Sequence, residues 1–269
     1  MTEMQEKFRH LISLLDDEDE LTAVSVIAAL LENESELGEL PAELQESDDP
    51  LLRRRAHQLQ AAMVFRRWRR EFRANIVAGD PDFFSGLVGL HLLWFDRDSR
   101  PVVEAALGDF IARCRQRQLN SLEDMAAAMR RMGMLCCKES IAAPELYCAG
   151  VVIDECAGAG SLLMGLLHDI AGKKEFQVVT VMGEFGIWDG QDGLLLGQDE
   201  WRVEKAPAPE QMEFWKPGAL LQNCCNMLFS AAVSSDSHRY VLTIAQALTG
   251  EGGEEILARL PYPYGDSKN

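Results

Sequence analysis

The stretch from Gly150 to Phe185 places the strongest constraint on what this chain can fold into. It begins with apolar residues and passes through a turn of small residues at 156–161. An apolar helical pattern follows, and then the β-branched run Val178–Val181. An apolar helix beside a β-branched strand is typical of the buried centre of a domain. The stretch therefore predicts a core helix and a core strand.

The residues before about 135 show helical periodicity almost throughout. The sequences LLDDED, from Leu14, and LQESDD, from Leu44, each precede an apolar helical pattern. This spacing indicates a weak helix-pair repeat of the HEAT-like kind, with too few units for a solenoid, so we expect it to pack on the rest of the chain. Further on, Pro81 suits the first position of one helix, and Ser121 with Asp124 marks the start of another.

The residues after 135 have a different texture. Glycine is frequent from Gly183 to Gly197, and D-G and G-Q-D turns separate four short candidate strands. These strands are Val178–Val181, Gly186–Trp188, Leu194–Leu196 and Trp201–Val203. Helical patterns return at 218–233 and 238–248, and the tail at 261–269 is irregular. The sequence therefore predicts an α+β fold that is mostly helical, with a small antiparallel sheet that includes a hairpin over Ile187–Leu196.

Charge and apolar content exclude several classes of protein. The net charge of −17 argues against general binding of nucleic acid, whose phosphates would be repelled. No apolar run reaches the roughly 18–20 residues that span a bilayer. The first ten residues lack the basic start and apolar middle of a signal peptide. We therefore expect a cytoplasmic protein that does not contact a membrane.

The cysteines predict neither a disulfide framework nor a metal site. There are seven, an odd number, at positions 114, 136, 137, 148, 156, 224 and 225. None forms a C-x-x-C motif, and the histidines form no H-E-x-x-H motif. We therefore expect buried thiols, no metal and no cofactor.

One segment is strongly basic. Between positions 53 and 73 there are eight arginines against the single acid Glu71. The arginines are Arg53, Arg54, Arg55, Arg66, Arg67, Arg69, Arg70 and Arg73. They could form a face for nucleic acid or an acidic partner. They could instead pair with the acidic surfaces of the same chain.

Three stretches resemble parts of one protein family. They are LLDDEDELTAVSVIAALL with DDPLLRRRAHQLQ, then ELYCAGVVIDECAGAGSLLMGLLHDIA, then ALLQNCCNMLFSAAVSSDSHRYVLTIAQAL. In order and spacing they are similar to the SirB-type transglutaminase-like proteins of bacteria. The resemblance implies a helical, HEAT-like region at 1–78, packed on a papain-like or transglutaminase-like core at 79–269 that ends in a helix pair.

The resemblance also implies where catalytic groups would stand. Active members place a cysteine at the start of the core helix, then a histidine and an aspartate on the following strands. In this chain the cysteine position falls near Gly158 or Ala159, the histidine position on Glu184, and the aspartate position near Gly197. The resemblance therefore implies a chain without the family's catalysis.

Cys156 offers a different interpretation, in which the chain is a thiol-dependent hydrolase or acyltransferase. A cysteine just before a helix can become a nucleophilic thiolate. However, His168 is twelve residues away, about 18 Å along a helix. Asp154 and Glu155 would raise the thiol pKa.

We therefore expect a non-catalytic protein whose role is to bind a protein or peptide, or to regulate one. The family's former active-site cleft and the helical repeat face are the two candidate surfaces. Catalysis by Cys156 and binding of nucleic acid or an acidic partner through Arg53–Arg73 remain the alternatives.

Overall fold

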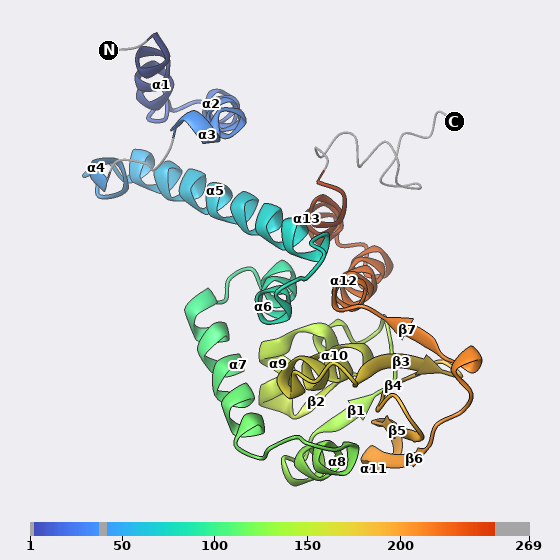
Figure 1. Ribbon diagram of the computed structural model, residues 1–269. Helices are drawn as coiled ribbons and strands as arrows, with labels where there is room; N and C mark the ends of the chain where they lie inside the picture. The colour runs from blue at the N-terminus through green and yellow to red at the C-terminus, as the bar shows by residue number, and fades with distance from the viewer. Residues whose placement is uncertain (1–2, 38–41, 251–269) are drawn as a thin grey trace, which may run out of the picture. The chain divides into compact units, whose positions relative to one another are not determined.

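A computed structural model describes residues 3–37 and 42–250 (Figure 1). The chain forms two compact units, Met1–Trp68 and Arg69–Asn269. The division falls inside one long helix, α5 (Pro50–Ile76), ten residues before the boundary that the sequence suggested at 78. The predicted irregular tail at 261–269 lies outside the described residues.

The first unit contains short helices around the first part of α5. They are α1 (Glu3–Ser13), α2 (Glu20–Glu32), α3 (Glu34–Leu37) and α4 (Ala42–Gln45). Their apolar faces meet in a small core of Phe8, Leu15, Val26, Leu30, Leu59 and Met63. The acidic run at 16–20 contains the N-cap of α2, Asp19, which accepts hydrogen bonds from the backbone N–H groups of Leu21 and Thr22. These bonds, with one from the Thr22 hydroxyl, lower the pKa of Asp19.

The second unit begins with helices, as the sequence predicted. These are α6 (Phe83–Trp94), α7 (Arg100–Arg115) and α8 (Leu122–Arg131). Ser121 and Asp124 form a capping box at the start of α8. Pro81 is not the first helical residue of α6: that helix begins at Phe83, because the Asp82 side chain accepts the N–H of Ser85 and sets the start two residues later.

A two-stranded parallel pair precedes the core helix. It joins β1 (Leu135–Cys137) to β2 (Ala157–Ala159). A 3-10 turn, η1 (Pro144–Tyr147), and the short helix α9 (Ala149–Glu155) connect the two strands. The sequence indicated only a turn at 156–161, because small residues carry little strand propensity.

The main sheet has five antiparallel strands in the order β6-β5-β4-β3-β7. The strands are β3 (Gln177–Val181), β4 (Glu184–Trp188), β5 (Gly193–Leu196), β6 (Arg202–Lys205) and β7 (Glu213–Trp215). The predicted hairpin is present, since Ile187 pairs with Leu195 across β4 and β5. Two short turns, α11 (Gln198–Trp201) and η2 (Pro209–Gln211), flank β6. The expectation of a mostly helical α+β fold with a small antiparallel sheet is confirmed.

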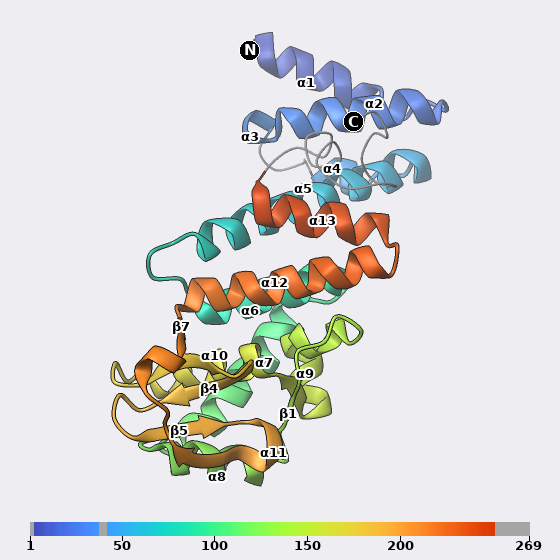
Figure 2. The same ribbon diagram turned by 90° about the vertical axis from the view of Figure 1, so that its right-hand side faces the viewer.

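The core helix α10 (Gly160–Ala171) lies between the sheet and the helices α6 and α12 (Pro217–Ser234) (Figure 2). Its residues from Gly160 to Leu167 are all buried, as expected for a helix with neighbours on every side. The contact with α6 is close enough that a Cβ at Gly165 would overlap the Phe83 ring. The last helix, α13 (His238–Thr249), packs on α12.

The two faces of the sheet differ in how they are covered. The face that carries Phe185 and Ile187 is buried toward α10, and α8 approaches the same face near Gly193. The opposite face carries a smaller cluster that includes Val179, Leu194, Leu196 and Met212. No helix in the described ranges combines the length and apolar character needed to cross a bilayer.

Candidate functional site at the start of the core helix

The start of α10 is buried and takes its hydrogen-bond acceptor from elsewhere in the chain. Its N-cap residue, Ala159, offers no side-chain cap. The backbone N–H of Ser161 instead donates to Oε1 of Glu139, at 2.8 Å. Glu139 follows β1, so the parallel β1–β2 pair brings this carboxylate to the helix. A carboxylate at this position also interacts favourably with the positive end of the helix dipole.

Two thiols lie next to this carboxylate, and both are held in the protonated form. Burial raises the pKa of Cys136 to about 12, and the charges of Cys137, Glu184 and Glu139 act in the same direction. Burial also raises the pKa of Cys224 to about 12. Since a thiolate, not a thiol, is the nucleophile, neither cysteine is activated at neutral pH.

The remaining polar groups around Glu139 are engaged with one another. The Ser161 hydroxyl lies 3.4 Å from the Cys224 Sγ. The Tyr147 hydroxyl accepts the backbone N–H of Ser140 at 2.9 Å. Burial, with the neighbouring Glu139 carboxylate, raises the pKa of Tyr147. The cluster is therefore a largely neutral network around one carboxylate, of which Oε1 accepts the Ser161 N–H and Oε2 is buried without a hydrogen-bond partner.

The positions that the family resemblance pointed to gather around Cys136. Gly158 lies opposite Cys136 in the β1–β2 pair, and Ala159 lies opposite Cys137. A Cβ at Gly197, which follows β5, would overlap the Cys136 side chain. Glu184, the first residue of β4, lies 3.5 Å from the Arg202 guanidinium.

Cys136 and Glu139 were not singled out by the sequence, because they come from a segment more than twenty residues before the core helix. Only the fold brings that segment to the helix start.

Cys156 lies apart from this network. It ends α9 with a left-handed backbone, φ 52°, and its thiol donates to the Ile153 carbonyl at 3.7 Å. Its neighbours Asp154 and Glu155 are exposed. His168, the nearest histidine in sequence, has its Nε2 3.1 Å from the Phe176 carbonyl.

His91 is buried among apolar residues of α6. Its Nε2 lies 2.9 Å from Asp98 Oδ2, and its ring stacks on Phe95. The ring also stands against the Cα of Gly150. These contacts hold the ring inside the packing of α6 and α9.

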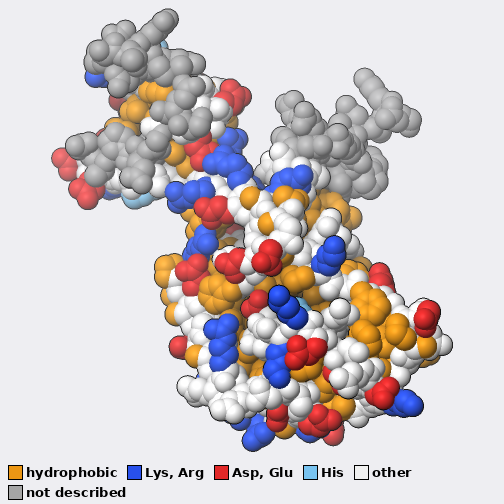
Figure 3. Space-filling view, in the orientation of Figure 1, with side chains coloured by type: hydrophobic (Ala, Val, Ile, Leu, Met, Phe, Trp, Pro, Cys, Tyr) orange, Lys and Arg blue, Asp and Glu red, His pale blue; other side chains and the backbone are white. Residues whose placement is uncertain are grey.

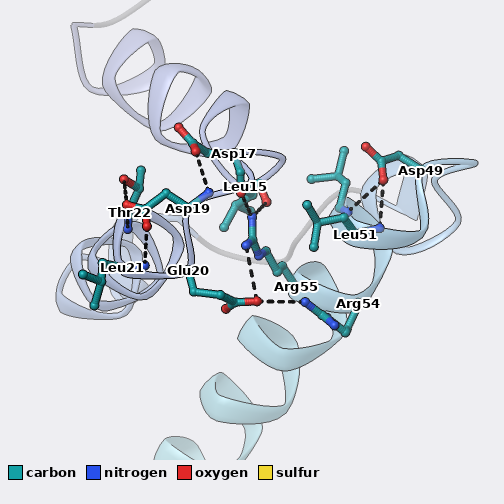
Figure 4. Close-up of polar contacts among 11 residues, drawn as sticks. Leu15, Asp17, Asp19, Glu20, Leu21, Thr22, Asp49, Leu51, Arg54 and Arg55 are labelled. Atoms are coloured by element: carbon teal, nitrogen blue, oxygen red, sulfur yellow. Dashed lines mark hydrogen bonds and ion pairs between the residues drawn. The ribbon is translucent and has the colours of Figure 1, made fainter.

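The arginines of the first unit are largely directed at the unit itself (Figure 4). Arg55 is buried, and its guanidinium donates to the backbone carbonyls of Leu15 and Asp17, just after the end of α1. Glu20 pairs with Arg54 at 3.0 Å and with Arg55 at 3.7 Å.

Three further arginines of the first unit lie along α5. Arg53 donates to the carbonyl of Ser47 at 2.8 Å. Arg66 donates to the carbonyl of Leu31 at 2.7 Å, near the end of α2. Arg67 is exposed. The side chains of this unit therefore act mainly as donors to helix ends and loops.

In the second unit, Arg73 donates to the carbonyl of Leu248 near the end of α13. Arg69 and Arg70 also interact with other residues. In each unit, therefore, some arginines of the basic segment already donate hydrogen bonds to groups of the same unit.

Within the described ranges, no group of three or more His, Cys, Asp or Glu side chains has the arrangement of a metal site. Comparison with protein-family models, with curated proteins and with solved structures finds no match to the chain.

Proposed function

We propose that this chain is a non-catalytic, transglutaminase-like protein that binds a segment of a partner protein. The observation that supports the non-catalytic part is the carboxylate of Glu139 on the Ser161 N–H. In a thiol enzyme of this class, the positive end of the core helix stabilises a thiolate. Here that position is filled by a fixed negative charge.

The same carboxylate opposes ionisation of the nearest thiol. A negative charge close to a thiol disfavours a second negative charge and raises the pKa. Glu139 and Glu184 both act on Cys136 in this direction. An activated nucleophile would require the reverse arrangement, with a cation beside the sulfur.

The binding part of the proposal rests on the far edge of the sheet. Among the residues that the structure describes, strand β7 pairs with β3 alone and so lies at the edge of the sheet. Phe214, in the middle of β7, is 47% exposed, and its ring centre lies 5.7 Å from that of Trp188 on β4. Figure 3 shows hydrophobic side chains gathered over this end of the sheet. An edge strand with one exposed aromatic ring, packed against a half-buried one, favours the addition of an extended peptide.

The charges beside the edge suggest the chemistry of that peptide. Glu213, which precedes Phe214 in β7, and Glu210, in the turn before this strand, are both exposed. A segment with a basic residue next to an apolar one would satisfy both the acids and the rings. We therefore propose an extended partner segment of mixed apolar and basic character.

Thiol labelling of the native protein tests the non-catalytic part. With iodoacetamide at pH 7, Cys136 and Cys224 should stay unmodified until urea unfolds the chain, because both thiols are protonated and poorly accessible. Peptide mass mapping would locate the label. Rapid labelling of Cys136 in the native protein would contradict this part of the proposal.

Selection from a displayed random-peptide library tests the binding part. The wild type should enrich apolar–basic peptides, and Phe214→Ser should lose that enrichment. Val102→Ser is the matched control, since Val102 is an exposed apolar residue, 65% exposed, on α7. Equal enrichment on all three proteins, or none on the wild type, would overturn the proposed binding edge.

A further inference from the structure

A cavity of about 680 Å³ lies on the second unit, away from the start of α10. Phe84 of α6 and Gly108, Ile111 and Ala112 of α7 give it an apolar floor. Arg115 and Asp169 give it two polar walls of opposite charge. Its volume lies in the range of clefts that bind small molecules.

The two charged side chains attract each other but are not joined by a direct bond. In the parts of the chain that the structure describes, neither the Arg115 side chain nor the Asp169 side chain makes a hydrogen bond or a close ion pair. Other arginines of the same unit are paired: Arg100, at the start of α7, contacts both Glu71 and Glu104. A cation and an anion that are not joined by a direct hydrogen bond therefore line the same hollow.

Asp169 is also in an unfavourable place for a carboxylate. It lies in the last turn of α10, where the helix dipole is negative and a cation is preferred. Burial raises its pKa, and the positive charge of Arg115 offsets part of that effect. A bound cation would offset both the cost of burying the charged carboxylate and its repulsion by the negative end of the helix dipole.

The hollow continues on the other side of Arg115. A second cavity of about 400 Å³ is lined by Arg115, Leu119 and Ile170, among others. Arg115 thus stands between two adjoining spaces with apolar residues in each.

We propose that this site binds a small zwitterion with an apolar body, of the class of short peptides with free ends. Its ammonium group pairs with Asp169 and the end of α10. Its carboxylate pairs with Arg115, and its apolar side chain lies on the floor formed by Phe84 and Ile111. This site is separate from the β7 edge, so it does not depend on the proposed partner segment.

Calorimetric titration of the full chain with three related dipeptides tests the charges. The probes are Leu-Leu, which carries both charges, its N-acetyl derivative, which lacks the ammonium group, and its C-terminal amide, which lacks the carboxylate. Leu-Leu should bind, and each cap should weaken binding about tenfold or more, since a charge-assisted bond is lost.

Two variants test which side chain binds which end of the dipeptide. In Arg115→Gln the amide should bind as well as free Leu-Leu, and in Asp169→Asn the N-acetyl derivative should do so. Leu-Leu that binds no better than its capped forms, or that shows no binding at about 10 mM, roughly ten times the 1 mM dissociation constant of a weak complex, would overturn the proposal.

A matched pair at Gly108 locates the site. A Cβ at Gly108 would meet nothing within 4 Å, so the position opens on the cavity. Gly108→Leu should fill the hollow and abolish binding, whereas Gly108→Ala should leave it nearly unchanged. Circular dichroism checks that both variants remain folded. Undiminished binding by a folded Gly108→Leu protein would place the dipeptide elsewhere and contradict the inference.

Discussion

Glu139 does at residue scale what a local N-cap does in most helices. It comes from a distant segment, yet its carboxylate accepts the Ser161 N–H at the start of α10. This N–H is buried, so the loss of its acceptor would leave a donor without a partner. Such a group destabilises the folded state more than an exposed one does.

Replacing Glu139 by Ala should therefore lower the free energy of unfolding by about 1–3 kcal/mol. Glu139→Gln, which keeps an amide oxygen as acceptor, should lose less. Urea unfolding followed by circular dichroism measures both changes. Glu145→Ala, at an exposed carboxylate of the same connection, serves as the control. Equal stability of Glu139→Ala and Glu145→Ala would show that the bond does not support the helix.

Asp169 gives a pH-dependent prediction. Burial raises its pKa in the folded protein, so the folded state binds the proton more tightly than the unfolded state does. Its contribution to stability is therefore complete below the unfolded pKa and is lost as the pH rises through the folded pKa.

Asp169→Asn removes that loss, so it should raise the Tm at pH 7 and change it little near pH 3. Thermal unfolding at the two pH values measures this difference. As a control, Asp109→Asn, at an exposed carboxylate on α7, should show no such pattern. A lower Tm for Asp169→Asn at pH 7 would mean that the carboxylate is stabilised in the fold.

At the scale of elements, the basic part of α5 supports the ends of other helices. Arg66 donates to a carbonyl at the end of α2, while the adjacent Arg67 is exposed. Carbonyls in the last turn of a helix have no partner within the helix, and a cation is favourable beside them.

Arg66→Ala should therefore lower the stability of the first unit by about 1 kcal/mol, and Arg67→Ala by less than about 0.5 kcal/mol. Chemical unfolding of the two variants under identical conditions makes the comparison. A larger effect at Arg67 would indicate that the exposed side chain has a structural partner.

Local signals predicted the elements whose stability is local. The capping box at Ser121 and the D-G turns of the β4–β5 hairpin were visible in the sequence because each involves residues close along the chain. The β1–β2 pair was not, because Ala157–Ala159 becomes a strand only through its partner.

The candidate site that the sequence predicted differs from the observed one because the observed site depends on contacts between residues far apart in the chain. The turn of small residues that leads into the core helix was recognised in the sequence, and the candidate nucleophile was Cys156, which lies in that turn. Cys136 and Glu139 reach it through tertiary structure. Similarly, a cluster of arginines was evident, while the carbonyls that several of them bind could not be identified from composition.

At the scale of the whole molecule, the chain divides into two units within the single helix α5. Each unit has its own buried residues, with Leu15 and Leu30 in the first and the α10 residues in the second. Units with separate cores can unfold at different free energies.

Arg55→Ala should therefore open the first unit selectively. The buried guanidinium satisfies the carbonyls of Leu15 and Asp17, and its loss should cost about 3 kcal/mol. Hydrogen exchange with mass spectrometry should show faster exchange in α1 and α2 and unchanged protection in α10. Equal acceleration in α10 would show that the two units unfold together.

The two-residue turn between β3 and β4 has a chemical consequence. Met182 and Gly183 both have positive φ, which is the geometry of a tight hairpin turn, and the Met182 side chain is fully exposed. By contrast, Met125, Met129 and Met164 are buried. Mild peroxide should therefore convert the Met182 thioether to its sulfoxide first, without disturbing the core. The extent of Met182 oxidation can then serve as a reference for oxidative footprinting of the sheet. A partner that covers this turn would lower it.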